Sequence, residues 1–287
     1  MMKSILCGSE QHQPQPELVA QISERTYRSD VMVDIVVNLS LVNLEGRNDF
    51  AQVFLALLKR EAKGRLPTIE YLITTENIIV SLVEGYESPD IALFCGKLLR
   101  ECIQYEPLAN IIFEDNQFFK FFEYVEMSNS EIASDAFATF KDLLTRHRTV
   151  CSEFLSDNFD RVFQAYNRLL ESENCLLRCQ SLKLLAELFG QQAYITVMMS
   201  YVGKPENLQL IMNNLRAENL SLQFEAFNVF KFFVGNPNKT KPVLDIFLKN
   251  QENLVDFLST FQNDRSDDEQ FHYEKIFLIE QIKELSG

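Results

Sequence analysis

The stretch 135–141 reads DAFATFK, and the stretch 225–231, ninety residues later, reads EAFNVFK. Comparable blocks begin at Asp90 (DIALFCGKLL) and at Gln180 (QSLKLLAELF), so that four blocks start at intervals of 45 residues. A further block of this type begins at Asp49 (DFAQVFLALLKR), 41 residues before Asp90. A regular period of this length predicts that the chain is built from one repeated structural unit.

When the four regular blocks are aligned, apolar or small side chains fall into four columns. The spacing of the columns within a block is i, i+3, i+6, i+7, which follows one face of an α-helix and does not fit the alternation of a strand. We therefore predict that each block is a helix whose columns face the core. The columns are Ala92, Phe137, Leu182 and Phe227; Cys95, Phe140, Leu185 and Phe230; Leu98, Leu143, Leu188 and Phe233; and Leu99, Leu144, Phe189 and Val234.

A second landmark recurs between the blocks, where an asparagine precedes an apolar segment. Asparagine is favoured as a helix N-cap because its side chain accepts a hydrogen bond from an otherwise unpaired backbone amide. We predict that each of these asparagines caps a further helix, so that one period holds a capped helix, a turn and the block helix. The asparagines are Asn77, Asn116, Asn158, Asn207 and Asn253.

Helical pairs or triplets of about 40–47 residues are typical of armadillo and HEAT repeats. Each unit has apolar faces that it cannot cover alone, so neighbouring units stack into one continuous core. The chain contains only 9 Gly and 8 Pro, which argues against a sheet-rich fold with many tight turns. The sequence thus predicts an all-α, armadillo/HEAT-like, right-handed helical-repeat solenoid that forms a single domain over residues 1–287.

The charge balance argues against a nucleic-acid-binding protein, and the cysteines indicate a cytoplasmic one. With 41 acidic and 27 basic residues, the net charge is −14, and such a surface repels nucleic-acid phosphates. No apolar run reaches the roughly 18 residues of a membrane span, and the N-terminus lacks a secretory signal. The scattered cysteines, with no CxxC pair, indicate reduced thiols in a cytoplasmic protein. They are Cys7, Cys95, Cys102, Cys151, Cys175 and Cys179.

The search for catalytic or metal-binding motifs predicts neither an enzyme nor a cofactor. The three His have no partner at metal-ligand spacing, and no phosphate-binding or nucleophile-elbow motif occurs. The acidic stretch 263–271 lacks the glycine and alternating ligands of an EF-hand, which indicates a solvated loop. Arg146 and Arg148, in the stretch TRHRT, either complement a helix dipole or form a basic spot that faces a partner.

Several long stretches resemble the calcium-binding protein 39 family of kinase-activating scaffolds. They include GYESPDIALFCGKLLRECI from Gly85, QFEAFNVFKFFVGNPNKTKP from Gln223 and FLKNQENLVDFLSTFQNDR from Phe247. The likeness covers essentially the whole chain and is densest between Gly85 and Lys275. Family members usually carry an additional N-terminal helical segment, so the resemblance implies that the N-terminal capping segment is shortened here.

The resemblance implies a non-catalytic scaffold for protein kinases. Its relatives bind a pseudokinase, hold a catalytic kinase in a heterotrimeric complex and activate kinases of the sterile-twenty group. They use two surfaces: a C-terminal hydrophobic pocket for a Trp-Glu-Phe tail, and a concave face that favours the active kinase conformation. We expect this chain to be a monomer when it is free.

The resemblance places three residues of this chain at the C-terminal pocket. Met212 and Lys249 stand at pocket positions of the family, and Lys183 matches a third. An apolar slot would take the aromatic rings of a tail, and lysine would meet its carboxylate. The alternative interpretation is that Met212 is ordinary core and that the two lysines are simply solvated.

The resemblance also indicates that the concave face is altered. Cys179, after Arg178 in CLLR, stands where relatives have arginine, while Gln192 and Ile195 replace a basic and an aromatic contact residue. Losing an arginine removes bidentate hydrogen bonds, and losing a ring removes an anchor. We therefore expect capture of the tail to survive and kinase activation to weaken. The alternative function is a generic armadillo-type adaptor for non-kinase protein cargo.

Overall fold

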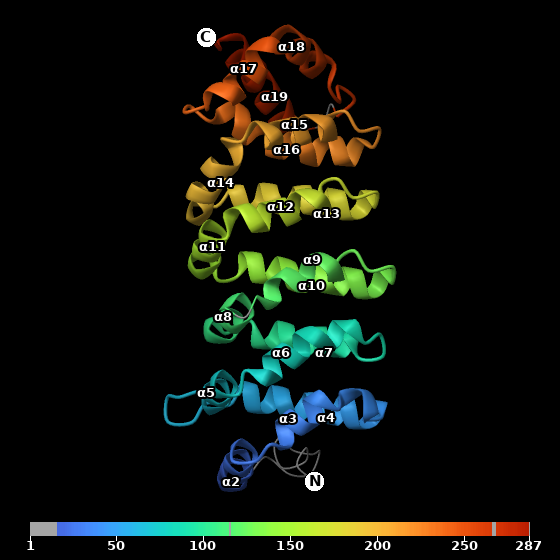
Figure 1. Cartoon of the computed structure of the whole chain (residues 1–287), viewed down its shortest axis with the longest axis vertical. Coiled ribbons are helices and arrows are strands. Elements are labelled where there is room, and N and C mark those ends of the chain that lie inside the picture. The colour runs from blue at the N-terminus through green and yellow to red at the C-terminus, as the bar shows by residue number, and fades with distance from the viewer. Residues whose placement is uncertain (1–15, 115, 266–267, 287) are drawn as a thin grey trace. The chain divides into compact units, whose positions relative to one another are not determined.

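The structure is a computed structural model that describes residues 16–114, 116–265 and 268–286 (Figure 1). Within these ranges the regular structure is helical and contains no β-strand beyond one isolated bridge between Ala62 and Arg65. The all-α helical-repeat fold that the sequence predicts is confirmed.

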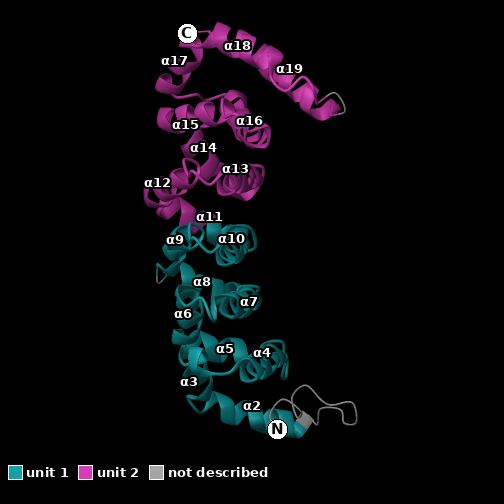
Figure 2. Ribbon diagram, turned by 90° about the vertical axis from the view of Figure 1, so that its right-hand side faces the viewer, with its two compact units in different colours: residues 1–151 teal, residues 152–287 magenta. Residues whose placement is uncertain are grey.

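The chain divides into two compact units, residues 1–151 and residues 152–287 (Figure 2). The single domain expected over residues 1–287 stays a prediction. Helix α11 (Arg148–Asp157) contains the boundary between the two units.

Unit 1 is built from sets of three helices, the last of which is a block helix. Figure 1 shows the block helices α4, α7 and α10 one above another on one side of the unit, and α7 packs against both α4 and α10. The sequence did not predict the first, short helix of each set. The described helices of unit 1 are α2 (Pro16–Tyr27), α3 (Val31–Val37) and α4 (Leu44–Leu58); α5 (Pro67–Thr74), α6 (Asn77–Glu84) and α7 (Ala92–Cys102); and α8 (Glu106–Glu114), α9 (Phe121–Tyr124) and α10 (Ser130–Thr145).

Unit 2 repeats the same order of helices. Its block helices are α13, α16 and α19, and α16 packs against both of the others. Proline stands in the first turn of α15 and of α17, where a missing backbone amide costs no hydrogen bond. The helices after α11 are α12 (Phe159–Leu169), α13 (Cys175–Phe189), α14 (Ile195–Val202), α15 (Pro205–Leu215), α16 (Leu220–Gly235), α17 (Lys241–Lys249), α18 (Gln251–Thr260) and α19 (Glu269–Lys283).

The predicted apolar columns form the core of both units. All sixteen column side chains are buried, and the most exposed of them, Phe137, is only 8% exposed. The corresponding residues of the block that begins at Asp49 are buried as well: Ala51, Phe54, Leu57 and Leu58. The prediction that the columns face the core is therefore confirmed, and burial of each large apolar side chain contributes about 1.5–3 kcal/mol.

Aromatic contacts account for the two similar heptapeptides. In unit 1, Phe140 of DAFATFK packs on Phe118 and Phe122, with ring centroids 5.4 and 5.1 Å apart. In unit 2, Phe227 of EAFNVFK packs on Phe271, with centroids 5.0 Å apart. The repeated motif is thus a packing element, since its rings fill the space between helices.

The predicted helix caps are wrong. Among the described residues, none of Asn77, Asn116, Asn158, Asn207 and Asn253 accepts a cap hydrogen bond through its side chain. Their side chains serve elsewhere: the Asn158 amide donates to the Phe154 carbonyl (3.0 Å), and the Asn207 amide donates to the Tyr201 carbonyl (2.9 Å). An asparagine amide can also donate to a carbonyl of the preceding helix, as both of these do, so residue type alone did not separate the two roles.

Different asparagines cap the block helices. The side chain of Asn129 accepts hydrogen bonds from the amides of Glu131 and Ile132, at 3.1 and 3.3 Å. Asn43, Asn174 and Asn219 do the same for α4, α13 and α16. In each of these helices the first column residue follows the cap by eight positions, so the cap fixes the register of the columns: Ala51 after Asn43, Phe137 after Asn129, Leu182 after Asn174 and Phe227 after Asn219.

A partly buried polar cluster joins α7 and α10 in unit 1. Arg100 Nη2 donates to Asp135 Oδ1 at 2.6 Å, and the Tyr86 hydroxyl donates to Asp135 Oδ2 at 2.7 Å. Thr139 lies 2.8 Å from the same hydroxyl. A Cβ at Gly96 would lie 2.0 Å from Asp135 Oδ2, so glycine is required where the helices approach each other around this cluster.

Candidate partner-binding pocket

A cavity of about 230 Å³ lies between α15 and α18 in unit 2. It is formed where the C-terminal end of α15 meets the N-terminal half of α18. The lining residues are Met212, Leu215, Arg216, Asn250, Asn253, Leu254 and Phe257.

The cavity combines an apolar floor with a polar rim. Met212, Leu215 and Leu254 are buried, whereas Arg216 and Asn253 are exposed. Among the described residues, Arg216 makes no salt bridge, so its guanidinium is available to a carboxylate. A slot of this kind suits an aromatic or apolar side chain beside an acidic group.

The three residues expected at the pocket lie at different distances from it. Met212 lines the cavity. Lys249 is the exposed last residue of α17 and directly precedes the lining residue Asn250. Lys183 is exposed on α13 and is not among the lining residues. The structure thus places Met212 in the cavity, whereas Lys249 and Lys183 are not part of its lining.

Most of the lining was not predicted from the sequence, including its only cationic residue, Arg216. A signal was present, because Asn250, Asn253, Leu254 and Phe257 are spaced i, i+3, i+4, i+7 and therefore share one face of a helix. Met212, Leu215 and Arg216 show the first part of the same spacing. Sequence spacing does not say which two faces meet, so the pair of faces was not identified.

Of the six residues proposed for the concave face, Arg146 and Arg148 belong to unit 1, and the other four belong to unit 2. Ile195, the first residue of α14, is 53% exposed, and Gln192 is exposed in the short 3₁₀ helix Gln192–Tyr194. Cys179 is half-buried on α13, and burial raises the pKa of its thiol. Arg178 is turned inward, because its Nη2 donates to Asn214 Oδ1 at 2.7 Å.

The two basic residues of TRHRT stand at different helix ends. Arg146 is the C-cap of α10 and pairs with Asp142 at 3.5 Å, a position that complements the helix dipole. Arg148 is instead the first residue of α11, so the dipole argument made for both residues is wrong for Arg148. Both side chains are exposed.

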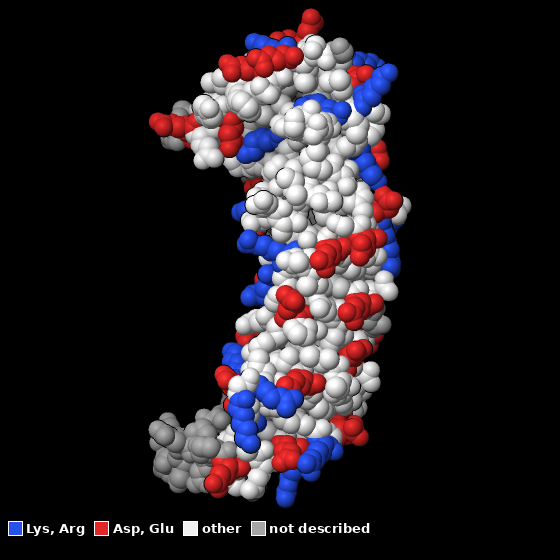
Figure 3. Space-filling model, turned by 90° about the vertical axis from the view of Figure 1, so that its left-hand side faces the viewer, with Lys and Arg blue, Asp and Glu red and all other residues white. Residues whose placement is uncertain are grey.

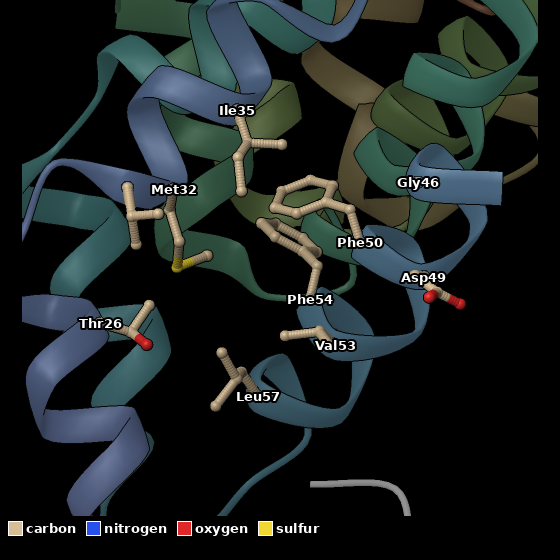
Figure 4. Close-up of a pocket in the computed structure, with 10 residues that line it drawn as sticks. Thr26, Met32, Ile35, Gly46, Asp49, Phe50, Val53, Phe54 and Leu57 are labelled. Carbon is tan, nitrogen blue, oxygen red and sulfur yellow. The ribbon is translucent and has the colours of Figure 1, made fainter. Parts of the chain in front are cut away.

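A second cavity, of about 270 Å³, lies in unit 1 between α3 and α4 (Figure 4). Met32 and Ile35 point toward it from α3, and Phe50, Phe54 and Leu57 point toward it from α4. Its polar lining consists of Thr26 and Asp49, so the cavity offers no cationic group to an acidic ligand.

The charged surface, possible metal ligands and possible membrane spans can be described in turn. On the face that Figure 3 shows, acidic and basic side chains are interspersed with broad uncharged areas in each unit. Among the described residues there is no cluster of three or more His, Cys, Asp or Glu placed to hold a metal ion. Over the same residues, no helix has the length and hydropathy needed to cross a bilayer.

Three-helix repeats with buried apolar columns define this protein as an armadillo-like helical-repeat protein. Residues 1–286 match the Mo25-like family, and the chain belongs to this family. It is 51% identical to the human and mouse proteins named calcium-binding protein 39-like, over 99% of this chain and 84% of theirs. It is 44% identical to MO25-like protein 2 of Caenorhabditis elegans, over 99% of this chain and 84% of that protein.

The resemblance predicted from the sequence is therefore confirmed. The similarity extends to fungi: the Mo25-like protein of Schizosaccharomyces pombe is 39% identical over 98% of this chain and 85% of its own length. The family is one of scaffold proteins, and the match indicates no catalytic family.

Proposed function

We propose that this protein is a non-catalytic scaffold that binds a protein kinase or pseudokinase and captures its acidic, aromatic C-terminal tail in the cavity between α15 and α18. The observation that carries the proposal is the composition of that cavity. Its floor is apolar and its rim presents Arg216, and the exposed Lys249 directly precedes the lining residue Asn250 in the sequence. A Trp-Glu-Phe-like tail has the complementary chemistry.

The physical basis is the pairing of ring burial with charge. A buried Trp or Phe ring removes about 150–250 Å² of surface from water, which makes such residues dominant anchors in interfaces. Met212 supplies a flexible thioether that adapts to an aromatic ring. A glutamate or terminal carboxylate gains most from Arg216, since a guanidinium forms two parallel hydrogen bonds.

Regulation of the kinase would follow from selective binding. A scaffold that binds the closed, active conformation better than the open one shifts the population toward activity. Cys179, Gln192 and Ile195 lack the guanidinium and the ring that the family's activating face carries. We therefore expect this protein to retain the tail and to stimulate sterile-twenty-type kinases weakly.

Titration of a labelled peptide that ends in Trp-Glu-Phe tests the pocket. We expect Met212→Ala to weaken binding tenfold or more and Arg216→Ala to weaken it more than Lys249→Ala. Lys183→Ala is the matched control, because Lys183 is exposed on a helix that does not line the cavity. Equal affinities for the wild type and Met212→Ala would refute the assignment of the cavity.

A kinase assay tests the second half of the proposal. We expect weak stimulation of a sterile-twenty-type kinase by the wild type and stronger stimulation by Cys179→Arg, with peptide affinity unchanged. Full stimulation by the wild type would contradict the expected weakening. A pull-down in which non-kinase proteins dominate and kinase domains are missing would instead favour the adaptor function.

A further inference from the structure

Helix α19 exposes a cluster of large apolar side chains. Tyr273 is 73% exposed, Ile276 is 55% exposed and Phe277 is 46% exposed. The spacing i, i+3, i+4 places all three on one face of the helix. We call Tyr273, Ile276 and Phe277 the α19 patch. None of these residues lines the cavity between α15 and α18.

The opposite face of α19 is fixed in the core, so the helix cannot rotate to bury the patch. Phe271, Leu278 and Ile282 are buried on that face, together with Lys275. Lys275 Nζ donates to the Phe261 carbonyl at 3.0 Å and to Asn263 Oδ1 at 2.6 Å. Turning the patch inward would break both hydrogen bonds and expose these apolar side chains.

The patch includes a position that other block helices bury. Asp268 caps α19 by accepting a hydrogen bond from the Phe271 amide (3.0 Å), and Ile276 follows this cap by eight residues. The residues eight positions after the asparagine caps of the other block helices are at most 8% exposed. Within the part of the chain that the structure describes, α19 thus leaves open a face that its counterparts cover with a neighbouring helix. The counterparts of Ile276 are Ala51, Phe137, Leu182 and Phe227.

Acidic residues frame the patch at both ends. Glu269 lies one turn before Tyr273, and Glu280 and Glu284 lie one and two turns after Ile276; all three glutamates are exposed. Lys283, also exposed, lies between the last two, so this end of the patch keeps a net charge of one negative unit among these three residues. At a rise of 1.5 Å per residue, Glu269 and Glu280 are about 16 Å apart along the helix. A ligand that fits this face has an apolar centre and a cationic group near each end.

A second copy of this chain does not fit that description. An antiparallel pair of α19 helices centred between Ile276 and Phe277 would set Glu269 of one copy against Glu284 of the other. A parallel pair would set each glutamate against itself. The parallel arrangement sets like charges against each other throughout. In the antiparallel one, Lys283 lies opposite the neutral Gln270 and only partly offsets the repulsion between the glutamates, to which the net charge of −14 adds.

We infer that the α19 patch binds a cationic amphipathic helix of a partner protein. Such a helix would place its apolar side chains against Ile276 and Phe277, as a neighbouring repeat does elsewhere in the fold. Its lysine or arginine residues would meet Glu269 and Glu280. About three to four helical turns cover the face. This inference goes beyond the capture of a tail in the cavity.

Fluorescence anisotropy with a designed peptide tests the inference. The probe is a labelled 16-residue helix with leucine along one face and lysine at both ends. Because an acidic protein attracts any cationic peptide, a second probe replaces the leucines with serine and keeps the lysines. We expect the first probe to bind at least tenfold more tightly than the second, and Ile276→Asp to remove this difference.

The variants need a matched control and a second apolar substitution. Leu176→Asp is the control, because Leu176 is 62% exposed on α13, and it should leave binding of the leucine probe unchanged. Phe277→Ser should weaken binding as Ile276→Asp does. Thermal unfolding of both variants at the wild-type temperature would show that they fold. A Glu269→Lys, Glu280→Lys double variant should bind the leucine probe at least tenfold more weakly and prefer a version with glutamate at its ends.

Three outcomes would overturn the inference. The first is equal binding of the leucine probe by Ile276→Asp and Leu176→Asp. The second is a concentration-dependent dimer in sedimentation that Ile276→Asp abolishes, which would assign the patch to a second copy of the chain. The third is co-sedimentation with neutral phosphatidylcholine vesicles that depends on Ile276. Met212→Ala should leave probe binding unchanged. A negative result here would therefore refute the α19 patch alone, and a negative peptide titration would refute the cavity alone.

Discussion

The two units bury the same apolar columns but pair their polar groups differently. The comparison is between the joint of α7 with α10 in unit 1 and the joint of α13 with α15 and α16 in unit 2. Unit 1 uses an ion pair between Arg100 and Asp135, whose side chains are 26% and 17% exposed. At the compared joint, unit 2 uses a neutral amide. The Asn214 side chain accepts a hydrogen bond from the Arg178 guanidinium and donates one to the Leu170 carbonyl at 3.2 Å.

The apolar columns thus determine how the block helices stack, and the polar positions between them are free to vary. Ninety residues beyond Arg100 and Thr139, the chain has Gly190 and Val229, so the α13–α16 joint has no counterpart of the charged cluster. A charged cluster contributes little when intact but is costly to break, because the remaining charge is left desolvated. The α7–α10 joint should therefore be more sensitive to a single polar substitution than the joint at Asn214.

Removing the acidic member of the cluster should have the largest effect. We expect Asp135→Ala to lower the free energy of unfolding by about 3 kcal/mol, since it leaves the guanidinium of Arg100 without its partner. Urea denaturation measures this loss. Glu225→Ala, at the equivalent position ninety residues later, is the matched control and should cost less than about 1 kcal/mol. Similar losses for the two variants would break the comparison.

Removing the amide in unit 2 should have a smaller effect. We expect Asn214→Ala to cost about 1–2 kcal/mol, because it deletes the hydrogen bonds to Arg178 and to the Leu170 carbonyl but removes a neutral amide and breaks no ion pair. Amide hydrogen exchange should show the loss of protection in α13 and α15. The exposed neighbour Asn213 provides the control, and Asn213→Ala should leave exchange unchanged. A loss as large as that of Asp135→Ala would show that neutral and charged joints are equivalent.

The smallest predicted effect is a dependence of stability on alkaline pH. Burial, and then the hydrogen bond to Asp135, raise the pKa of Tyr86 well above its ordinary value. A folded-state pKa above the unfolded one means that this stabilisation is complete below about pH 10 and is lost as the pH rises further. One such group contributes at most about 1.4 kcal/mol per pH unit.

Tyr86→Phe should reduce the loss of stability measured by urea denaturation between pH 10 and 11. Tyr273→Phe, at a side chain that is 73% exposed, should leave that loss unchanged. In unit 2, burial lowers the pKa of Lys275, so this group increases stability as the pH rises and opposes the effect of buried tyrosines. An unaltered pH profile for Tyr86→Phe would contradict the role given to the cluster.

The fold was predictable from the sequence because burial follows the helical period directly. The columns through Phe140 and Phe230 could be read from spacing alone, and both side chains are fully buried. The helix starts were not predictable in this way. Asn207 and Asn219 have the same side chain, yet one donates to a carbonyl beside its own helix and the other caps a block helix. The choice depends on where neighbouring helices lie.

The candidate pocket was predictable only in part. The family resemblance pointed to Met212, and the structure places this residue in the cavity. The rest of the lining depends on two helix faces, one ending at Arg216 and one beginning at Asn250, that tertiary packing brings together. Lys183 shows the converse: a residue at a matching position points to solvent from a separate helix.

The asparagine caps have a consequence for how such a chain tolerates insertions and deletions. Because α4, α10, α13 and α16 each take their start from an asparagine, the length of the preceding loop does not decide which side of the helix turns inward. If residues were inserted or deleted before Asn129 or Asn219, the following helix would still turn its column residues toward the core. Evolution can thus lengthen or trim those connections, while a shift of one residue between the cap and Phe137 would turn that ring away by about 100°.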